Sequence, residues 1–335
     1  MENGQLKSSL ADLFLAAGID SGGMEINPIY GGGNNRVVSI QTTDGKYLAK
    51  TYYSHPTDTR NRLASEYSFL SYALNIGLDC IPKPVFCDKQ NNIGLYEFIE
   101  GRKLDSSDLT SQHISEAATF IKGLNAGVDR DPTLPTASEG GFSVEQHFSI
   151  IDFRLRRLRD IPSDTNSDRQ ALSFVREIES SWKKTKDDVS ARCESISKDL
   201  GVDDRCISPS DFGFHNALLK KSGKVCFLDF EYAGWDDPAK MVDDFFLQPA
   251  VSVSFNYFED FVSVALDYSK NKTKLGERAH LLFPVFKIKW CCLMLNEFFP
   301  DAAKRRRFAN PALDSEHNKR SQLEKAQQFF HSREA

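Results

Sequence analysis

The stretch from residue 206 to residue 232, CISPSDFGFHNALLKKSGKVCFLDFEY, constrains the fold more than any other part of the chain. It contains two short strand-like runs, ALL and VCFLDF, with a glycine-containing turn between them. This pattern predicts a β-hairpin. Asp211 and Asn216 lie on the loop before the hairpin, and Asp229 lies near the end of its second strand. Folding the hairpin would therefore bring three oxygen-bearing side chains together.

This set of side chains is suited to phosphoryl transfer. An aspartate orients the attacking hydroxyl group and accepts its proton, while Mg²⁺ takes one charged and one neutral oxygen ligand beside the nucleotide phosphates. In protein kinases the catalytic Asp is followed by an Asn five positions later and then by a second Asp that opens a DFG turn. Asp211, Asn216 and Asp229 occur in this order, and the second turn reads DFE. We therefore predict that Asp211 is catalytic and that Asn216 and Asp229 bind Mg²⁺.

Two other interpretations of this stretch stay open. Residues 211–213 also read DFG, but as a metal-binding turn they would need an upstream catalytic Asp with an Asn five positions after it. Asp203 and Asp204 lack that Asn, and this interpretation leaves Asn216 and Asp229 without a role. The simpler alternative is structural, because the same side chains could form an Asx-turn and cap a strand end.

The N-terminal block, roughly residues 24–53, is rich in strand-like runs. A DG dipeptide at 44–45 separates two of them and predicts a hairpin. A glycine-rich turn precedes this hairpin, and glycines let backbone N–H groups approach an anion without obstruction. A glycine loop, a strand and then a lysine is how a kinase covers the phosphates of a nucleotide. The residues predicted to line this nucleotide site are Gly31, Gly32, Gly33, Asn34 and Lys50.

A helix is predicted over residues 59–76. Its apolar stripe at helical spacing consists of Leu63, Tyr67, Leu70 and Leu74. Glu66 lies beside this stripe, in the place where a kinase uses a glutamate to hold the lysine. A hairpin with NN at its turn follows, and its second strand leads to backbone groups expected to hydrogen-bond a nucleotide base, at Glu97, Phe98 and Ile99.

The chain is predicted to divide into an N-terminal domain at 1–101 and a mainly helical domain at 102–335. Helices in the second domain are expected near 108–126, 144–161, 170–200, 254–269 and 277–299. The basic cluster KRRRF at 304–308 could be a nucleic-acid patch. Because it is isolated, a solvated helix end is the better explanation.

Composition limits the classes of function. The chain of 335 residues is 40% hydrophobic and 27% charged, which is ordinary for a soluble globular protein. Its formal net charge of −5 argues against a dedicated nucleic-acid binder. Neither a signal peptide nor a membrane span is expected. Seven cysteines without metal-ligand spacing indicate reduced thiols, so we expect a cytoplasmic protein, of an oligomeric state that the sequence does not indicate.

The order of these motifs resembles the aminoglycoside phosphotransferase and choline kinase family. The resemblance covers about residues 25–300 and is most specific in SDFGFHNALL, FLDFEYAGWDDPAKMVDDFF and KWCCLMLNEF. It implies an α+β, two-lobed protein-kinase-like fold, with a small N-terminal antiparallel β-sheet lobe that carries one helix and a larger helical C-terminal lobe. It also implies ATP as phosphoryl donor, Mg²⁺ as cofactor, and a small-molecule hydroxyl group as acceptor. Lys50 would contact the α- and β-phosphates, with Glu66 in support.

The sequence departs from the family pattern around Asp211. Pro209 replaces the histidine two residues before the catalytic Asp, and Gly213 replaces the one two residues after it, while a histidine occurs at His215. The proline removes a hydrogen-bonding ring, so a catalytically weak, kinase-fold nucleotide-binding or regulatory protein is the alternative to an active kinase. A protein kinase is disfavoured, because no activation segment with an A-P-E-like motif follows the DFE turn.

Candidate substrate contacts follow the DFE turn, at Glu231, Tyr232, Trp235 and Asp243. Carboxylates there could pair with an amine, and the aromatic rings could stack on a sugar or a quaternary ammonium. Alternatively, Asp236–Asp237–Pro238 caps a helix and Asp243 pairs with a buried Arg or Lys. The sequence does not choose among a sugar, an amino alcohol and an aminoglycoside as acceptor.

Overall fold

The N-terminal lobe is built on a five-stranded antiparallel sheet with the strand order β1-β2-β3-β5-β4. In chain order the strands are β1 (Glu25–Ile29), β2 (Arg36–Gln41), β3 (Lys46–Thr51), β4 (Pro84–Asp88) and β5 (Ile93–Glu97). The computed structural model that shows this sheet describes residues 3–30, 33–55, 58, 60–127, 130–193, 199–309 and 315–332. The predicted DG hairpin is confirmed, since β2 and β3 pair along their whole length.

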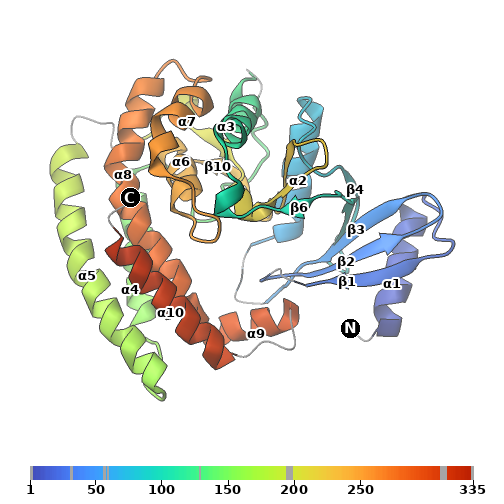
Figure 1. The fold of residues 1–335 in the computed structure, drawn as a ribbon, viewed down its shortest axis with the longest axis horizontal. Coiled ribbons are helices and arrows are strands. Elements are labelled where there is room, and N and C mark those ends of the chain that lie inside the picture. Colours follow the sequence, from blue (N-terminus) through green and yellow to red (C-terminus); the bar gives the residue numbers. More distant parts are fainter. Residues whose placement is uncertain are drawn as a thin grey trace.

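Two helices accompany this sheet (Figure 1). α1 (Asn3–Ala16) packs on it through a small apolar cluster that includes Leu10, Leu13, Phe14, Ile40 and Leu95. α2 (Arg62–Asn75) begins after Asn61, whose side chain accepts a hydrogen bond from the Ala64 N–H at 3.0 Å. Such a cap satisfies a backbone donor that the first turn leaves unpaired, so it explains why the helix begins here, a few residues later than predicted.

A second, three-stranded sheet carries the hairpin of residues 206–232. Its strands are β6 (Arg102–Lys103), β8 (Ala217–Leu219) and β9 (Val225–Phe227), in the order β6-β8-β9. β8 and β9 pair antiparallel, with Ala217 opposite Phe227, which confirms the predicted hairpin. On either side of it lie β7 (Cys206–Ser208) and β10 (Gly234–Asp236), which pair with each other. The segment that precedes the hairpin and the segment that follows it are thereby held together.

The rest of the described chain is mainly helical, as predicted. The helices are α3 (Ser111–Asn125), α4 (Val144–Leu158), α5 (Asn166–Arg192), α6 (Pro238–Leu247), α7 (Phe258–Ala265), α8 (Lys272–Met294), α9 (Pro300–Ala309) and α10 (Ser315–His331). Short 3₁₀ turns lie at Ser106–Asp108, Val202–Asp204, Phe214–Asn216, Phe255–Tyr257 and Leu295–Phe298. No described helix is both long and apolar enough to cross a membrane.

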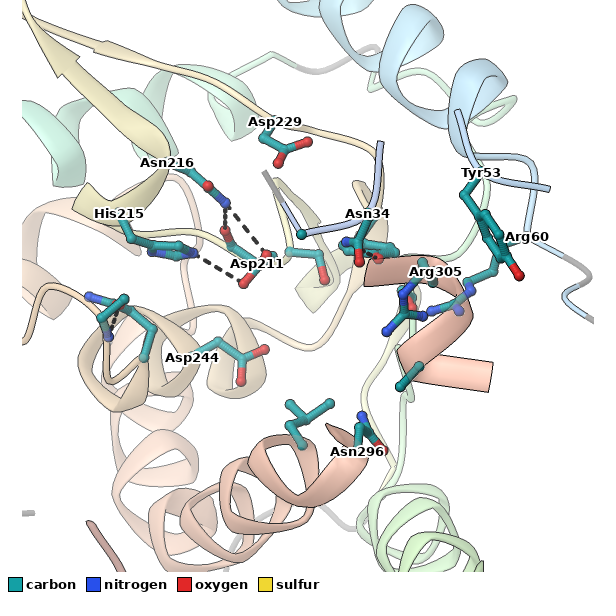
Figure 2. Close-up of a pocket in the computed structure, with 18 of the residues that line it drawn as sticks. Asn34, Tyr53, Arg60, Asp211, His215, Asn216, Asp229, Asp244, Asn296 and Arg305 are labelled. Atoms are coloured by element: carbon teal, nitrogen blue, oxygen red, sulfur yellow. Dashed lines mark hydrogen bonds and ion pairs between the residues drawn. The ribbon is translucent and has the colours of Figure 1, made fainter. Parts of the chain in front are cut away.

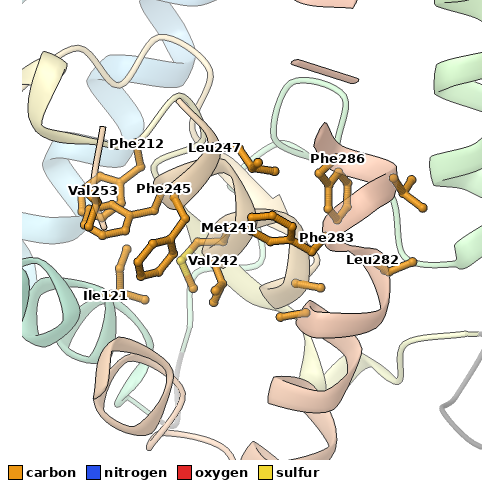
Figure 3. Packing of buried hydrophobic residues seen from close by; sticks show 14 of the residues in the cluster. Ile121, Phe212, Met241, Val242, Phe245, Leu247, Val253, Leu282, Phe283 and Phe286 are labelled. Atoms are coloured by element: carbon orange, nitrogen blue, oxygen red, sulfur yellow. The ribbon is translucent and has the colours of Figure 1, made fainter. Parts of the chain in front are cut away.

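Phenylalanine side chains form the centre of the helical lobe (Figure 3). The ring of Phe245 on α6 stacks on Phe261 with centroids 4.4 Å apart and on Phe212 with centroids 5.3 Å apart. Phe227 of the hairpin stacks on Phe120 of α3 at 5.0 Å. Each fully buried ring contributes about 1.5–3 kcal/mol. Because Phe212 directly follows Asp211, this packing fixes the loop that carries the predicted catalytic residue.

α9 connects the helical lobe with the N-terminal sheet (Figure 1). The Arg36 Nε atom of β2 donates a hydrogen bond of 2.9 Å to the backbone oxygen of Phe308, and its guanidinium lies 4.4 Å from the centre of the Phe308 ring. Tyr53 meets the same ring edge-on at 5.4 Å. We call these contacts of Arg36 and Tyr53 with Phe308 the α9 bridge.

Candidate active site

Lys50, Glu66 and Asp229 meet although they lie in three separate elements. The Lys50 Nζ atom on β3 lies 2.7 Å from Glu66 Oε2 on α2 and 2.5 Å from Asp229 Oδ1. Burial lowers the pKa of Lys50, but the negative charges of Asp229 and Glu66 outweigh it and raise the pKa well above its usual value. The lysine is therefore a fixed cation in the cleft at neutral pH.

Buried hydrogen bonds hold Glu66 in place. The Tyr52 hydroxyl donates to Glu66 Oε2 at 2.6 Å and lies 2.6 Å from the Tyr96 hydroxyl. The backbone N–H of Phe230 donates to Glu66 Oε1 at 3.3 Å. Both carboxylate oxygens are thus occupied, and one of the bonds comes from the residue that follows Asp229. The lysine–glutamate pair and the DFE turn are therefore positioned as one unit.

The loop before the hairpin presents Asp211 to the same space (Figure 2). The Asn216 Nδ2 atom donates to the Asp211 backbone oxygen at 2.9 Å, and the His215 Nε2 atom lies 3.3 Å from Asp211 Oδ1. Burial raises the pKa of Asp211, but the hydrogen bond and the charge of His215 outweigh it, so the pKa lies below its usual value. Asp211 is therefore ionised at neutral pH.

Asp229 has a backbone φ of 65°, in the left-handed region that non-glycine residues rarely adopt. The residue before it, Leu228, donates its N–H to the backbone oxygen of Asn216 at 2.8 Å. This bond ties the DFE turn to the Asp211–Asn216 loop. Such backbone strain persists only where the surrounding structure determines it, and it clusters at functional sites. Figure 2 shows Asn216 directed at Asp211, with Asp229 above both.

A cleft of about 1010 Å³ joins these residues to the segment between the lobes. It is lined by Lys50, Asp211 and Asp229, and also by Glu97 and Ile99 at and beyond the end of β5. One continuous space therefore reaches from the proposed base-binding segment to the aspartates. This is the shape that a nucleotide triphosphate and an acceptor placed end to end would need.

A family model for the phosphotransferase enzyme family matches residues 25–240, which is well over half of the chain. The chain belongs to the phosphotransferase enzyme family. Three solved structures show the same fold: choline kinase from Cryptosporidium parvum, choline kinase from Streptococcus pneumoniae, and spectinomycin phosphotransferase in complex with ADP and spectinomycin. A search of curated protein sequences found no match.

These structural likenesses span almost the whole phosphotransferase chain at low sequence identity. The Cryptosporidium enzyme is 12% identical, with a TM-score of 0.62, over 97% of this chain and 96% of its own. The Streptococcus enzyme is 17% identical, with a TM-score of 0.59, over 97% and 99%. Spectinomycin phosphotransferase is 13% identical, with a TM-score of 0.59, over 98% of both chains. They establish the fold of this phosphotransferase.

The glycine-rich turn of this phosphotransferase is only partly described, because Gly31 and Gly32 lie outside the described residues. Gly33 packs against the guanidinium of Arg306 on α9, so closely that a Cβ atom at Gly33 would collide with it. Asn34 lines the cleft, and its Nδ2 atom donates to Glu231 Oε1 at 2.8 Å. The turn is thus held by contacts with two distant parts of the chain.

Glu231 joins the glycine-rich turn to the DFE turn and is not positioned to reach a substrate. The residue is 2% exposed, and its carboxylate accepts hydrogen bonds from Asn34 at 2.8 Å and from Asn35 at 2.6 Å. The sequence-based prediction of a substrate contact is therefore wrong for this residue. Tyr232 does line the cleft, where its hydroxyl accepts a bond from Asn34 at 3.0 Å.

Two other predicted substrate residues also lie away from the cleft lining. The Trp235 Nε1 atom donates to the Asp131 backbone oxygen at 3.0 Å, and the ring packs beside Arg130. Asp243 is 0% exposed, and within the described chain neither of its side-chain oxygens has a hydrogen-bond partner, so it contacts neither substrate nor a buried cation there. Both predictions are corrected, because strand pairing turns Trp235 toward residue 131 and α6 turns Asp243 inward.

The remaining predicted residues have the following places. Phe98 lies outside the cleft lining, with its ring 3.9 Å from Lys46 Nζ, while backbone contacts of this segment with a base stay a prediction. Asp237 is the N-cap of α6, as its side chain accepts from the Ala239 N–H at 2.9 Å. Asp236 pairs with Lys240 at 2.6 Å. The capping interpretation of this segment is confirmed.

Sequence reasoning missed the arginines of the cleft. Arg60 precedes α2, and Arg305 and Arg306 belong to the KRRRF cluster, which was expected to be a solvated helix end. All three line the cleft, as do Arg154 and Arg157. That expectation is wrong for Arg305 and Arg306, and holds for Lys304 and Arg307, which are exposed. The cluster itself was the signal, but the fold decides which side chains of α9 face inward.

Proposed function

We propose that this phosphotransferase transfers the γ-phosphoryl group of ATP to a hydroxyl group of a small molecule, with Mg²⁺ as cofactor. The observation that carries the proposal is the convergence of Asp211, Asn216, Asp229 and Lys50 on one cleft. Buried contacts position each of these side chains before any ligand arrives. Phosphoryl transfer depends mainly on such positioning and on electrostatic stabilisation, because the protein has little covalent chemistry to perform.

Asp211 is suited to orient the acceptor hydroxyl. Its ionised carboxylate accepts the hydroxyl hydrogen bond and receives the proton as the oxygen attacks phosphorus. His215 and Asn216 hold Asp211 from the side of its own loop, so the hydroxyl approaches from the cleft. The pKa of Asp211 lies below its usual value, which keeps the acceptor of the proton ionised at neutral pH.

Lys50 is suited to bind the nucleotide phosphates. Its ammonium is fixed by Glu66 and Asp229 at the end of a strand that borders the glycine-rich turn. A lysine held in this way neutralises phosphate charge without having to be ordered during the reaction. Glu66 is a positioning residue, since its own oxygens are occupied by Lys50, Tyr52 and the Phe230 N–H.

Asn216 and Asp229 fit a magnesium ion. The Asn216 nitrogen donates to Asp211, which leaves the amide oxygen for a cation, and the Asp229 carboxylate is 36% exposed toward the cleft. No described group of three or more His, Cys, Asp and Glu residues could hold a metal ion. That agrees with Mg²⁺, which uses one or two protein carboxylates together with substrate phosphates. When bound, the ion neutralises charge on the β- and γ-phosphates.

The structural neighbours support the donor and the acceptor class. Spectinomycin phosphotransferase was solved with ADP and spectinomycin, and the other two neighbours are choline kinases. These names place an adenine nucleotide and small hydroxylated acceptors in proteins of this fold. They favour ATP and a small-molecule alcohol here, and leave the chemical class of the acceptor open.

Paired aspartate variants test the proposal. We expect Asp211→Ala to retain Mg²⁺-dependent ATP binding and to lose ATP turnover by about 10²–10⁴-fold, which is the usual effect of removing a general base. Asp229→Ala should lose the Mg²⁺-dependent part of ATP binding. Calorimetric titration with ATP and ADP release measure the two properties separately. If neither the unaltered protein nor Asp211→Ala releases ADP above background while Asp229→Ala abolishes ATP binding, the protein binds nucleotide without this chemistry.

A further inference from the structure

Arg305 presents a cation to the cleft, and no carboxylate of the described chain is paired with it. It lies on α9 and lines the cleft beside Tyr232. Within the described part of the chain it forms no ion pair, and its Nε atom is buried without a hydrogen-bond partner. Burial lowers the pKa of Arg305, and the neighbouring charges of Arg306, Arg62 and Arg60 lower it further, while Tyr232 acts in the opposite direction. A guanidinium enclosed by other cations and lacking an anion is costly unless an anion binds there.

The carboxylates around Arg305 are already engaged by other cations. Asp58 binds Arg60 at 2.7 Å and Arg62 at 2.5 Å. Glu297 accepts from Arg306 at 2.7 Å. These acids balance the arginines that contact them directly, and none of them forms an ion pair with Arg305 in the described structure.

The same holds for the carboxylates on the helical wall of the cleft. Asp244 binds Lys289 at 2.5 Å and Lys240 at 3.3 Å. Glu139 is paired with Arg154. Asp301 is exposed and lies 3.8 Å from the exposed Lys304. Apart from Asp301 and the aspartates assigned to catalysis and Mg²⁺, the carboxylates named here already have close cationic partners.

Arg305 and Arg60 lie together on one side of the cleft, while Asp211 and Asp229 lie across from them (Figure 2). Asp244 and Asn296, which also line the cleft, lie below both groups in this view. An acceptor that reaches from the arginines to Asp211 would place its hydroxyl at the aspartate and its other end at the cations. That end would be favoured if it carried a negative charge, because guanidinium groups bind carboxylate and phosphate in matching planar geometry.

We propose that the acceptor is a hydroxylated small molecule that carries a carboxylate or phosphate group, and that Arg305, assisted by Arg60, binds this group. This inference rests on the proposed function and specifies its substrate class. It runs against an amine-bearing acceptor, for which the cleft would need free carboxylates. Arg305 is a specificity-determining residue in this proposal, separate from the residues that bind the nucleotide.

Four hexoses of one size class test the proposal: glucosamine, glucose, glucuronate and glucose 6-phosphate. Binding is measured by calorimetry on the full chain saturated with Mg²⁺ and the non-hydrolysable analogue β,γ-imido-ATP, so that the triphosphate site is filled. We expect glucuronate or glucose 6-phosphate to bind better than glucose, and glucosamine to bind least. Arg305→Ala should weaken the anionic hexoses by about ten- to a hundredfold, the usual value of a hydrogen-bonded charge contact.

Arg307→Ala is the matched control, since Arg307 lies on the same helix but is exposed and outside the cleft lining. It removes the same charge and should leave hexose binding unchanged. No preference for the anionic hexoses, or a preference that survives in Arg305→Ala, overturns the inference. So does an Arg305→Ala variant that loses affinity for β,γ-imido-ATP instead, because the arginine would then serve the nucleotide. Failure of the proposed function can be recognised separately, because the unaltered protein would then not bind β,γ-imido-ATP in a Mg²⁺-dependent way.

Discussion

Asp243 should destabilise the folded protein at neutral pH, and replacing it by asparagine should remove this effect. The residue is fully buried on α6, and neither oxygen has a hydrogen-bond partner among the described residues. Burial, together with the negative charges of Asp244 and Asp237, raises the pKa of Asp243 well above its usual value. The folded protein therefore keeps this carboxyl protonated at pH values where the unfolded chain has released the proton.

The sign and size of the effect follow from proton linkage. Because the folded state binds more protons than the unfolded state, the free energy of unfolding falls as pH rises from the unfolded pKa, about 4, to the raised folded pKa of Asp243. The contribution is about 1.4 kcal/mol per pH unit in that window. An amide at this position has nearly the shape of the protonated acid without its titration, so Asp243→Asn should be more stable at pH 7, by about 1.4 kcal/mol for each pH unit of the window already passed.

Asp237, the N-cap of the same helix, supplies a control of opposite sign. Burial raises its pKa, but Arg278 at 2.7 Å and His147 at 3.0 Å outweigh burial and lower the pKa of this carboxyl. Asp237→Asn breaks a buried ion pair and should cost about 3–5 kcal/mol. Urea unfolding of both variants between pH 5 and pH 8 gives the two free energies. If Asp243→Asn is destabilised at pH 7 and keeps the pH slope of the unaltered protein, then Asp243 is ionised and the reasoning is refuted.

Two further variants test the contacts that join distant parts of the cleft. Glu231→Gln weakens the charged hydrogen bonds from Asn34 and Asn35, so it should cost about 1–3 kcal/mol of stability and lower ATP affinity. Urea unfolding measures the stability and ATP titration measures the affinity. An unchanged stability together with an unchanged affinity would contradict the assigned role of Glu231. Phe308→Ala removes the ring of the α9 bridge, so ADP should dissociate faster and α9 should be cut sooner by protease. Stopped-flow release of a fluorescent ADP and timed proteolysis measure these two rates. Rates equal to those of the unaltered protein in both assays would contradict the role of the bridge.

The parts of the site that the sequence predicted are those that local chain geometry determines. Asp211, Asn216 and Asp229 lie within one hairpin, whose strand runs and turn are visible in the sequence, so their approach follows from the pairing of β8 with β9. Lys50 and Glu66 come from a strand and a helix in an order typical of kinases, and the structure places them 2.7 Å apart. The lobes and most helices also follow from periodicity, with ends shifted by a few residues because caps such as Asn61 decide them.

The parts that the sequence could not predict depend on contacts between remote segments. Glu231 looked available for substrate until the fold brought Asn34 and Asn35 to it, from 197 and 196 residues away. Trp235 was assigned by its aromatic character, whereas the pairing of β10 turned its indole toward Asp131. Arg305 belongs to a run of basic residues that looks uniform in one dimension, and only the packing of α9 separates the side chains that enter the cleft from those in water.

The α9 bridge adds to the other connections between the lobes, which include the chain crossing after β5 and the hydrogen bonds of Asn34 and Asn35 to Glu231. Because a hinge motion about the chain crossing alone would break these contacts, opening of the proposed nucleotide site would require the Arg36–Phe308 hydrogen bond to break. The helix that must then move also holds Arg305, which we assign to the acceptor. Release of both products would accordingly depend on the same movement of α9.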